Sequence, residues 1–463
     1  MHLTMGKVLI LGAGLVARPM VDYFIANGFQ FVIASPTKGR ADEMINGNAL
    51  GASVDWSMDD PETLEMLIAG NDVVVSHLPY KYHADVARIC IRQRKPLVTT
   101  SCIQNEMQGF DEAAKNAGIL FLNEAGFDPG LDHMSAMKII DLIHDNGGKV
   151  EEFYSFCGVL PAPEAANNPM KYKFSWSPRG VVLASLNSAM YLKGRREVFT
   201  DSKDIFKNIF TFNFPQVGNL DVYPNRDSLN YMGIYGIPEA KTVYRGTFRY
   251  KGWCETMDAI KSLNMLDDAI RDYNGFGYID FLAERAGLPV TDLKKNIAIR
   301  LGVAEQSPAI RSLEYLGFFS DEKMKYYETN PFEVTSDRMI DRMMLGDNEH
   351  DMVALQHIFL ALWGNGRKEV IKSSMLCYGT PSENTAIART AALPASIAVK
   401  LILENRIRAT GVLRPVLPEI YNPILEELKR YGIEMKEEYN LPENQINLFV
   451  SNQSEVRSPK SIE

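Results

Sequence analysis

Short apolar segments alternate with helix-like segments over the first 125 residues. Residues 7–11 are apolar at almost every position, as in a strand that is covered on both faces. The helix-like stretch that follows ends at Asn27-Gly28, where the glycine is a good helix stop. Further apolar segments that read as strands lie at 29–34, 52–55, 72–76, 96–100 and 119–123. The alternation predicts an α/β fold with a parallel sheet.

Beyond residue 125 the strand and helix patterns mix. A turn-rich segment, 126–133, precedes a predicted helix over 134–144, and residues 255–365 are patterned mostly as helix. Strands are predicted at 153–158, 197–200, 243–250 and 372–379. Near the end we expect a long apolar helix over 386–403 that is interrupted at Pro394, an amphipathic helix over 419–431 and a disordered tail over 452–463.

These patterns predict three domains. The first is a Rossmann-type parallel sheet over residues 1–125, to which a C-terminal segment of about 400–450 returns. The second is a mixed α+β domain, built from 126–254 and about 370–400. The third is an inserted helical subdomain over 255–369.

The composition is that of an enzyme-sized globular protein. The chain has 463 residues, 46% of them hydrophobic and 23% charged, with a net charge of −9. An acidic balance disfavours a nucleic-acid partner, because phosphate backbones are bound by basic surfaces. It leaves room for a small anionic substrate, which needs only a local cationic pocket.

Cysteine and histidine spacing disfavours disulfides and metal sites. The five cysteines are widely separated and never form a CxxC pair, and the seven histidines form no HExxH motif. No uninterrupted apolar run reaches the roughly 18 residues that span a bilayer, and the first residues lack the basic segment of a signal peptide. We therefore expect no metal, no membrane and a reduced, cytoplasmic location.

A glycine-rich turn follows the first predicted strand directly. It reads Gly12-Ala13-Gly14-Leu15-Val16-Ala17, a GxGxxA pattern. In a strand–turn–helix context Gly12 permits the tight turn, Gly14 lets a pyrophosphate approach the backbone, and Ala17 allows close packing of helix on strand. The helix N-terminus offers unpaired N–H groups to the diphosphate. The turn predicts a dinucleotide site.

The end of the second strand favours NADP(H) over NAD(H). NAD-binding proteins usually place an acid there for the ribose 2′-hydroxyl. This chain instead has Ser35-Pro36-Thr37-Lys38-Gly39-Arg40, which offers hydroxyls and two cations to a 2′-phosphate. The alternative is a solvated turn whose two cations face water.

Several segments resemble one enzyme family over nearly the whole chain. They are the glycine turn with Arg18-Pro19, the segment from Leu78 to His83, Val98-Thr99-Thr100-Ser101, the segment from Asn123 to His133, the segment from Cys157 to Glu164, the segment from Tyr172 to Gly180, the segment from Tyr223 to Ser228 and the segment from Arg245 to Tyr250. Together they resemble the saccharopine reductases, which are NADP-dependent, L-glutamate-forming saccharopine dehydrogenases. The resemblance implies a Rossmann domain, an α/β domain that forms a homodimer, and a helical domain.

The resemblance also implies a reaction in lysine metabolism, including lysine biosynthesis. L-Glutamate condenses with 2-aminoadipate 6-semialdehyde, and NADPH reduces the imine to saccharopine; the reverse reaction oxidises saccharopine. The implied cofactor-binding residues are Gly12, Ala13, Gly14, Leu15, Val16, Ser35, Pro36, Thr37, Lys38, Val54, Asp55, Leu78, Thr100, Ser101, Phe127, Asp128, Pro129 and Ser177. The implied substrate-binding residues are Ser101, Cys102, Asp128, Arg226, Thr247, Phe248 and Arg249.

Ligand chemistry agrees with this set. Saccharopine carries three carboxylates, which Arg226 and Arg249 can bind through two parallel hydrogen bonds each, and Asp128 can pair with an ammonium group. Asp128 and Cys157 are the expected catalytic residues, Asp128 by favouring a protonated imine. His77 and His133 are better read as structural, so no single general base is assigned. Cys102 departs from the family, which usually has tyrosine there, and this affects binding detail and the pH profile.

Two other functions compete with this reading. One is a related imine reductase, such as a carboxynorspermidine-type dehydrogenase, which would act on a diamine and need more acidic groups than the two arginines provide. The other is a non-catalytic NADP-binding regulator, for which Cys102 is the only supporting feature.

Overall fold

The chain forms two compact units. The computed structural model describes residues 6–381 and 384–447, so the tail predicted to be disordered lies outside the described residues. The first unit comprises the described residues up to 148 and those from 373 to 436, and the second comprises 149–372 and those after 436. Residues 126–148 and 373–400, which we expected in the second domain, lie in the first unit. The division into three domains stays a prediction.

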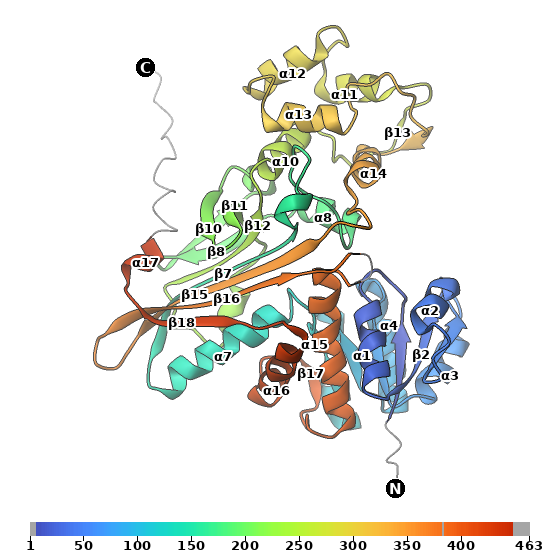
Figure 1. The fold of residues 1–463 in the computed structure, drawn as a ribbon, viewed down its shortest axis with the longest axis vertical. Coiled ribbons are helices and arrows are strands. Elements are labelled where there is room, and N and C mark those ends of the chain that lie inside the picture. The colour runs from blue at the N-terminus through green and yellow to red at the C-terminus, as the bar shows by residue number, and fades with distance from the viewer. Residues whose placement is uncertain (1–5, 382–383, 448–463) are drawn as a thin grey trace. The chain divides into compact units, whose positions relative to one another are not determined.

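A seven-stranded parallel sheet forms the centre of the first unit (Figure 1). The strands are, in spatial order, β17 (Gly411–Leu413), β6 (Leu120–Leu122), β5 (Leu97–Thr99), β4 (Val73–Ser76), β1 (Lys7–Leu11), β2 (Gln30–Ser35) and β3 (Gly51–Asp55). The Rossmann-type sheet is confirmed. The C-terminal segment returns to it through β17, whose three residues pair with β6.

Helices accompany the strands of this sheet, as parallel crossovers require. They are α1 (Arg18–Ala26), α2 (Lys38–Ile45), α3 (Pro61–Ala69), α4 (His83–Gln93), α5 (Asn105–Gln108), α6 (Asp111–Ala117), α7 (Leu131–Asp145), α15 (Ala386–Leu403) and α16 (Pro418–Leu428). Strand side chains such as Leu9 and Val74 and helix side chains such as Leu64 and Val86 form one buried apolar core. The sheet is thereby held rigidly behind the loops at its carboxyl edge.

Helix α15 differs from its prediction in two ways. It continues through Pro394 without interruption, because neighbouring packing supports a helix that lacks one N–H donor. It is also long and apolar enough to cross a membrane by length and composition alone, whereas no uninterrupted apolar run of that length was predicted. Most of its residues are buried in the first unit, where it packs on α1, β4 and β5.

The second unit contains most of a mixed sheet of nine strands; β16 continues past residue 372 into the first unit, and β18 begins at residue 436, the last residue of the first unit. Its main path is β10 (Phe210–Phe214), β11 (Gly218–Pro224), β12 (Thr242–Arg249), β7 (Lys149–Pro161), β15 (Asp351–Leu362), β16 (Lys368–Tyr378) and β18 (Lys436–Leu441), with β8 (Ala189–Lys193) and β9 (Arg196–Thr200) at its side. The mixed second sheet is confirmed. The prediction of helix up to residue 365 was wrong for β15, which is buried on both faces and therefore lacks the alternation that marks a strand.

The remaining described helices of the second unit lie mainly in the segment predicted as helical. They are α8 (Pro178–Ala184), α9 (Asn230–Ile234), α10 (Trp253–Ser262), α11 (Tyr278–Ala286), α12 (Leu293–Leu301), α13 (Pro308–Tyr315), α14 (Pro331–Met343) and α17 (Asn444–Asn447), with the short strands β13 (Arg271–Asp272) and β14 (Glu328–Thr329). Figure 1 shows α11, α12 and α13 grouped beyond the end of the mixed sheet. The inserted helical segment is confirmed by this arrangement.

Register places several functional candidates on one face of the mixed sheet. Tyr223 pairs with Thr247, and Thr247 pairs with Cys157, so their side chains project to the same side. Arg249, two residues beyond Thr247 on β12, shares that face. Phe248 lies on the opposite face, where its ring packs against Phe156 at a centroid distance of 5.8 Å. The aromatic core thus supports the polar face from behind.

Candidate functional site

The glycine turn has the geometry that a dinucleotide requires. Gly12 has φ +103°, and a Cβ there would meet the carbonyl oxygen of His77 at 3.4 Å. Gly14 has no atom within 4 Å of a Cβ placed on it, so its backbone is open to a ligand. Helix α1 begins only at Arg18, later than the motif predicts, with Ala17 before it. The space beside Gly14 and the nearby helix N-terminus fit a diphosphate.

The hydroxyl groups that follow β2 are held together. The Ser35 and Thr37 hydroxyl oxygens lie 2.9 Å apart, and the Thr37 backbone N–H donates to the Ser35 oxygen at 3.2 Å. Ser35 is buried, and its carbonyl also accepts a hydrogen bond from Trp56. The turn with Pro36 is therefore a fixed feature rather than a loose surface loop.

The two cations of this turn differ in their surroundings. Lys38 pairs with Asp42, four residues later, at 2.9 Å, and Asp42 also accepts a hydrogen bond from Ser53. Arg40 is exposed, and its side chain has no hydrogen-bond or ion-pair partner among residues 6–381 and 384–447. Lys38 and Ser53 hold the pKa of the Asp42 carboxyl below its usual value. Arg40 is thus the cation with a guanidinium group to offer an external phosphate.

The carboxyl ends of the central strands carry the other candidates of the first unit. Val54 and Asp55 end β3, Leu78 follows β4, and Thr100 and Ser101 follow β5. Ser101 is partly exposed, and its backbone carbonyl accepts from the Glu124 N–H at 3.2 Å. Cys102 is exposed. These positions lie where ligands bind in doubly wound sheets.

Two histidines lie behind this edge, of which His83 is buried and His77 is partly exposed with its Nε2 buried. His83, at the start of α4, contacts the Ser76 hydroxyl through Nδ1 at 3.1 Å and the Ser101 hydroxyl through Nε2 at 3.0 Å. Burial lowers the pKa of His83 to about 4, and burial together with the nearby His83 lowers the pKa of His77 to about 4. Both imidazoles are therefore neutral at neutral pH.

The loop after β6 is fixed by a buried carboxylate. Glu124 accepts hydrogen bonds from His133, from Arg414 and from the Ile103 N–H. Burial alone would raise the pKa of Glu124, but these partners lower it below its ordinary value. The loop between Glu124 and His133 contains the predicted residues Phe127, Asp128 and Pro129, of which Phe127 is buried and Asp128 is partly exposed.

The second unit holds a buried arginine surrounded by rings. The guanidinium carbon of Arg249 lies 5.0 Å from the ring centre of Tyr172, 5.2 Å from that of Trp253 and 5.9 Å from that of Tyr223. Its Nη1 donates to the Phe248 carbonyl at 2.9 Å, whereas its Nε is buried and has no hydrogen-bond partner within residues 6–381 and 384–447.

No carboxylate of the described part of the chain pairs with Arg249. Two donors beside it, the Tyr172 hydroxyl and the Trp253 indole nitrogen, are also buried and have no hydrogen-bond partner among the residues that the structure describes. A buried cation without a counter-charge is costly, so this cluster has the chemistry of an anion site. Burial raises the pKa of the Tyr172 hydroxyl, against the opposing charge of Arg249, and keeps it a donor.

The other predicted residues of the second unit lie around this cluster or at its sheet edge. Cys157 and Thr247 share the face of Arg249, Phe248 points into the aromatic core, and Ser177 precedes α8. Arg226 is exposed, adopts a left-handed backbone with φ +48°, and has no side-chain partner among the described residues. The predicted site residues thus form two groups, one in each unit.

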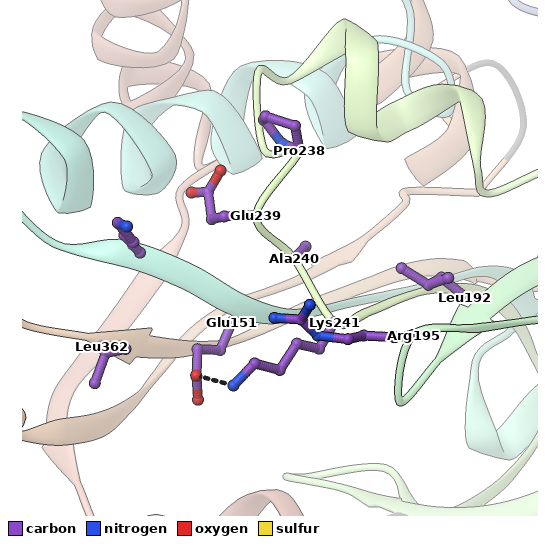
Figure 2. A pocket seen from close by; sticks show the side chains of 9 residues that line it. Glu151, Leu192, Arg195, Pro238, Glu239, Ala240, Lys241 and Leu362 are labelled. Atoms are coloured by element: carbon purple, nitrogen blue, oxygen red, sulfur yellow. Dashed lines mark hydrogen bonds and ion pairs between the residues drawn. The ribbon is translucent and has the colours of Figure 1, made fainter.

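A separate cavity of about 450 Å³ lies at the other end of β7 (Figure 2). It is lined by Lys149, Glu151, Leu192, Arg195, Pro238, Glu239, Ala240, Lys241 and Leu362. Glu151 pairs there with Lys241 and, at 2.8 Å, with Lys368, and these partners lower its pKa although burial raises it. None of the predicted site residues lines this cavity.

Sequence reasoning missed several residues of these groups. Tyr172, Tyr223 and Trp253 surround Arg249 from distant parts of the chain, and only the fold brings them together. His83 lay within a recognised motif but was not named as a site residue. Within the described residues, no group of three or more His, Cys, Asp or Glu side chains is placed to hold a metal ion, and none of the five cysteines is in a disulfide.

Two protein-family models match the chain. The "Saccharopine dehydrogenase NADP binding domain" matches residues 8–122, and the "Saccharopine dehydrogenase C-terminal domain" matches residues 126–433. The saccharopine dehydrogenase [NADP(+), L-glutamate-forming] of Saccharomyces cerevisiae is 38% identical, over 94% of this chain and 99% of its own length.

Longer relatives and a solved structure extend the comparison. The alpha-aminoadipic semialdehyde synthase of Arabidopsis thaliana is 35% identical over 93% of this chain, which spans 44% of that protein. An apo structure of histidine-tagged saccharopine dehydrogenase (L-Glu forming) from Saccharomyces cerevisiae superposes with a TM-score of 0.86 at 36% identity, covering 94% of this chain and 99% of that one.

Proposed function

The chain belongs to the saccharopine dehydrogenase family, and we propose that it catalyses the NADP-dependent, L-glutamate-forming reaction of that family. In this reaction NADPH reduces the imine of L-glutamate and 2-aminoadipate 6-semialdehyde to saccharopine, or NADP oxidises saccharopine in reverse. The chain is then an oxidoreductase that acts on a CH–NH bond in lysine metabolism.

The observation that carries the proposal is Arg249. A fully buried guanidinium with an unpartnered Nε and no carboxylate partner among the described residues is matched by a carboxylate of the substrate. Saccharopine has three such groups. A diamine substrate would meet a cation instead, which disfavours the carboxynorspermidine-type reaction.

The first unit supports the choice of cofactor. The open backbone at Gly14, the paired hydroxyls of Ser35 and Thr37, and the unpartnered Arg40 suit a dinucleotide with a 2′-phosphate. No acid stands directly at the end of β2 to repel that phosphate. Once bound, the cofactor supplies or accepts the hydride.

The protein's own residues then bind and orient the substrate and the cofactor, and they polarise the imine. We propose that Asp128 stabilises the protonated imine electrostatically and that Cys157, on the face of Arg249, lies beside the reacting centre. The cofactor contacts are assigned to the positions inferred from the family resemblance, and the substrate contacts to Ser101, Cys102, Asp128, Arg226, Thr247, Phe248 and Arg249. Phe248 contributes through its backbone, because its ring faces the core.

Steady-state kinetics test the proposal directly. Saccharopine with NADP, and L-glutamate with the semialdehyde and NADPH, should turn over faster than a diamine with aspartate semialdehyde. Faster turnover of the diamine pair would overturn the assignment. If NADPH binds but its absorbance does not change with either substrate pair, the chain is a cofactor-binding regulator.

We further propose that the chain acts as a cytoplasmic homodimer. The family resemblance supports the dimer, and the widely spaced cysteines, none of them in a disulfide, are compatible with a reducing compartment. Sedimentation equilibrium, which should give twice the 52.0 kDa of the chain, tests the dimer, and fluorescence microscopy of the tagged protein tests the location.

A further inference from the structure

Ser101 is held at both its backbone and its side chain. Its carbonyl accepts the Glu124 N–H at 3.2 Å, and its hydroxyl oxygen lies 3.0 Å from His83 Nε2. Within the described residues this is the only hydrogen bond of the Ser101 side chain, which is partly exposed at the carboxyl edge of the sheet. One side of the hydroxyl is therefore fixed by the protein while the other side is open.

The hydrogen bonds continue from Ser101 through His83 to Ser76, and the side chain of Ser76 is buried. The Ser76 hydroxyl is 1% exposed, and its one partner in the described part of the protein is His83 Nδ1 at 3.1 Å. If Nδ1 carried the proton, the Ser76 hydrogen would be a buried donor without an acceptor, which is rare in folded proteins. If Ser76 donates to Nδ1, only lone pairs stay unused. The second arrangement is favoured.

The donation from Ser76 to Nδ1 also fixes the direction of the hydrogen bond between His83 and Ser101. With Nδ1 accepting, a neutral imidazole carries its proton on Nε2 and donates it to the Ser101 oxygen. The Ser101 hydrogen cannot then point at His83 and is directed to the open side. We infer that His83 is a positioning residue that makes the Ser101 hydroxyl a hydrogen-bond donor toward an acceptor oxygen of the bound ligand, a carboxylate of the substrate or the carboxamide of the cofactor.

The inference rests on the proposed function only in naming that ligand. The chain Ser76–His83–Ser101 does not deliver protons, because loss of a proton through it would leave an alkoxide on buried Ser76. Its role is orientation. His77, whose Nε2 is buried and unpartnered, is near His83 but is not a member of the chain.

Two substitutions separate the two ends of the imidazole. His83→Gln places an amide near the position of Nε2 and can still donate to Ser101, whereas His83→Asn reaches only the Nδ1 position and Ser76. We expect H83Q to keep kcat/KM for saccharopine within about 3-fold of wild type, and both H83N and Ser101→Ala to lower it about 10-fold, the value of one hydrogen bond. The double variant H83N/S101A should be no slower than S101A alone.

Other outcomes would overturn the inference. If the H83N and S101A losses multiply in the double variant, His83 does not act through Ser101. If H83Q is as slow as H83N while both keep the wild-type melting temperature, donation at Nε2 is not what matters.

A spectroscopic measurement is independent of activity. In protein labelled with ¹⁵N-histidine, long-range ¹H–¹⁵N spectra at pH 7 should show His83, identified by its loss in H83Q among the seven histidines, protonated at Nε2 only. Protonation at Nδ1 would overturn the inference even if saccharopine is turned over. Absence of wild-type turnover together with an Nε2-protonated His83 would instead refute the proposed function.

Discussion

His133 Nε2 lies 2.7 Å from a carboxylate oxygen of Glu124, and both side chains are buried. The same oxygen accepts from Arg414 Nε at 3.0 Å, and the other carboxylate oxygen accepts from the Ile103 N–H. Glu124 itself has a left-handed backbone with φ +57°. One carboxylate therefore joins the end of β6, the start of α7 and the segment after β17, and it fixes both ends of the loop that contains Asp128.

Glu124→Gln should destabilise the protein. The amide keeps the size of the side chain but turns an NH2 group toward one of three donors and removes the charge that His133 and Arg414 face. We expect the free energy of unfolding to fall by about 2 kcal/mol, the scale of a buried hydrogen bond to a charged group. Urea unfolding at pH 7 measures it.

Glu62→Gln is the matched control, since Glu62 is exposed in the first turn of α3. It should change the free energy of unfolding by less than about 0.5 kcal/mol. Equal stability of E124Q and E62Q would show that the Glu124 network contributes little.

The fold was predictable where local patterns were strong. The first six strands of the parallel sheet each have an apolar segment, and each was predicted. Strand β17 was not identified because three residues give no periodicity, and only pairing with β6 defines it. Strand β10 was not predicted either, although the alternation Phe210-Thr211-Phe212-Asn213-Phe214 is typical of a strand with one buried face.

The site was predictable where the chemistry is local. The glycine turn can be recognised in the sequence. The ion pair of Lys38 with Asp42 can be predicted as well, because residues four apart are neighbours on a helix. The rings around Arg249 could not be predicted in the same way. Tyr172, Tyr223 and Trp253 are separated by up to 81 positions, and only the packing of β11, β12 and α10 brings them to one guanidinium.

Arg40 should discriminate between the two nicotinamide cofactors more strongly than Lys38. Arg40 has no partner to give up among the described residues, whereas Lys38 is already paired with Asp42. We expect Arg40→Ala to raise the Kd for NADPH about 10-fold and leave that for NADH unchanged, and Lys38→Ala to raise the NADPH Kd less than about 3-fold. Fluorescence titration with both cofactors measures this. Equal losses for NADPH and NADH in R40A would contradict the 2′-phosphate assignment.

Arg249→Met should separate stability from binding. Removing a buried, unpaired charge relieves a desolvation cost, so we expect a melting temperature equal to or above that of wild type. The KM for saccharopine should rise about 10- to 100-fold, since a charged hydrogen bond is worth roughly 1.5–3 kcal/mol.

Arg195→Ala serves as the comparison for R249M. Arg195 is an exposed arginine of the same unit that lines the separate cavity, and its loss should leave KM unchanged. A wild-type KM in R249M would mean that the guanidinium only supports the aromatic cluster.

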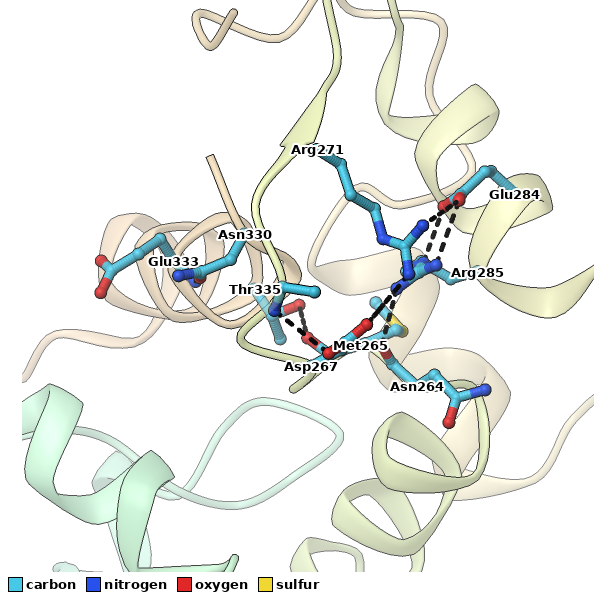
Figure 3. A network of polar contacts seen from close by, with 10 residues as sticks. Asn264, Met265, Asp267, Arg271, Glu284, Arg285, Asn330, Glu333 and Thr335 are labelled. Carbon is cyan, nitrogen blue, oxygen red and sulfur yellow. Dashed lines mark hydrogen bonds and ion pairs between the residues drawn. The ribbon is translucent and has the colours of Figure 1, made fainter. Parts of the chain in front are cut away.

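Arg285 should be important for the stability of the helical segment (Figure 3). Its side chain is 7% exposed and lies 3.3 Å from Asp267 and 2.7 Å from Glu284, while Arg271 lies 3.2 Å from the same Asp267 oxygen. Arg285→Ala removes the most buried cation of this network, and we expect a loss of about 2 kcal/mol in unfolding free energy. Arg271→Ala, whose side chain is 41% exposed, should cost less than about 1 kcal/mol. A smaller loss in R285A than in R271A would contradict this ranking.

His77 and His83 should make the stability of the protein depend on pH. In the folded protein the pKa values of His77 and His83 are lowered to about 4, from 6.5 in the unfolded chain, so between these values the unfolded chain binds more protons. The stabilisation is complete above pH 6.5 and is lost as the pH falls toward 4, by about 1.4 kcal/mol per pH unit for each histidine.

His83→Gln removes one of the two groups, so the difference in unfolding free energy between wild type and H83Q should change by that amount per pH unit between pH 6 and 5. Urea unfolding at pH 7, 6 and 5 gives this difference. If it is independent of pH over that range, the pKa of His83 in the folded protein is the same as in the unfolded chain, and burial does not hold this imidazole neutral.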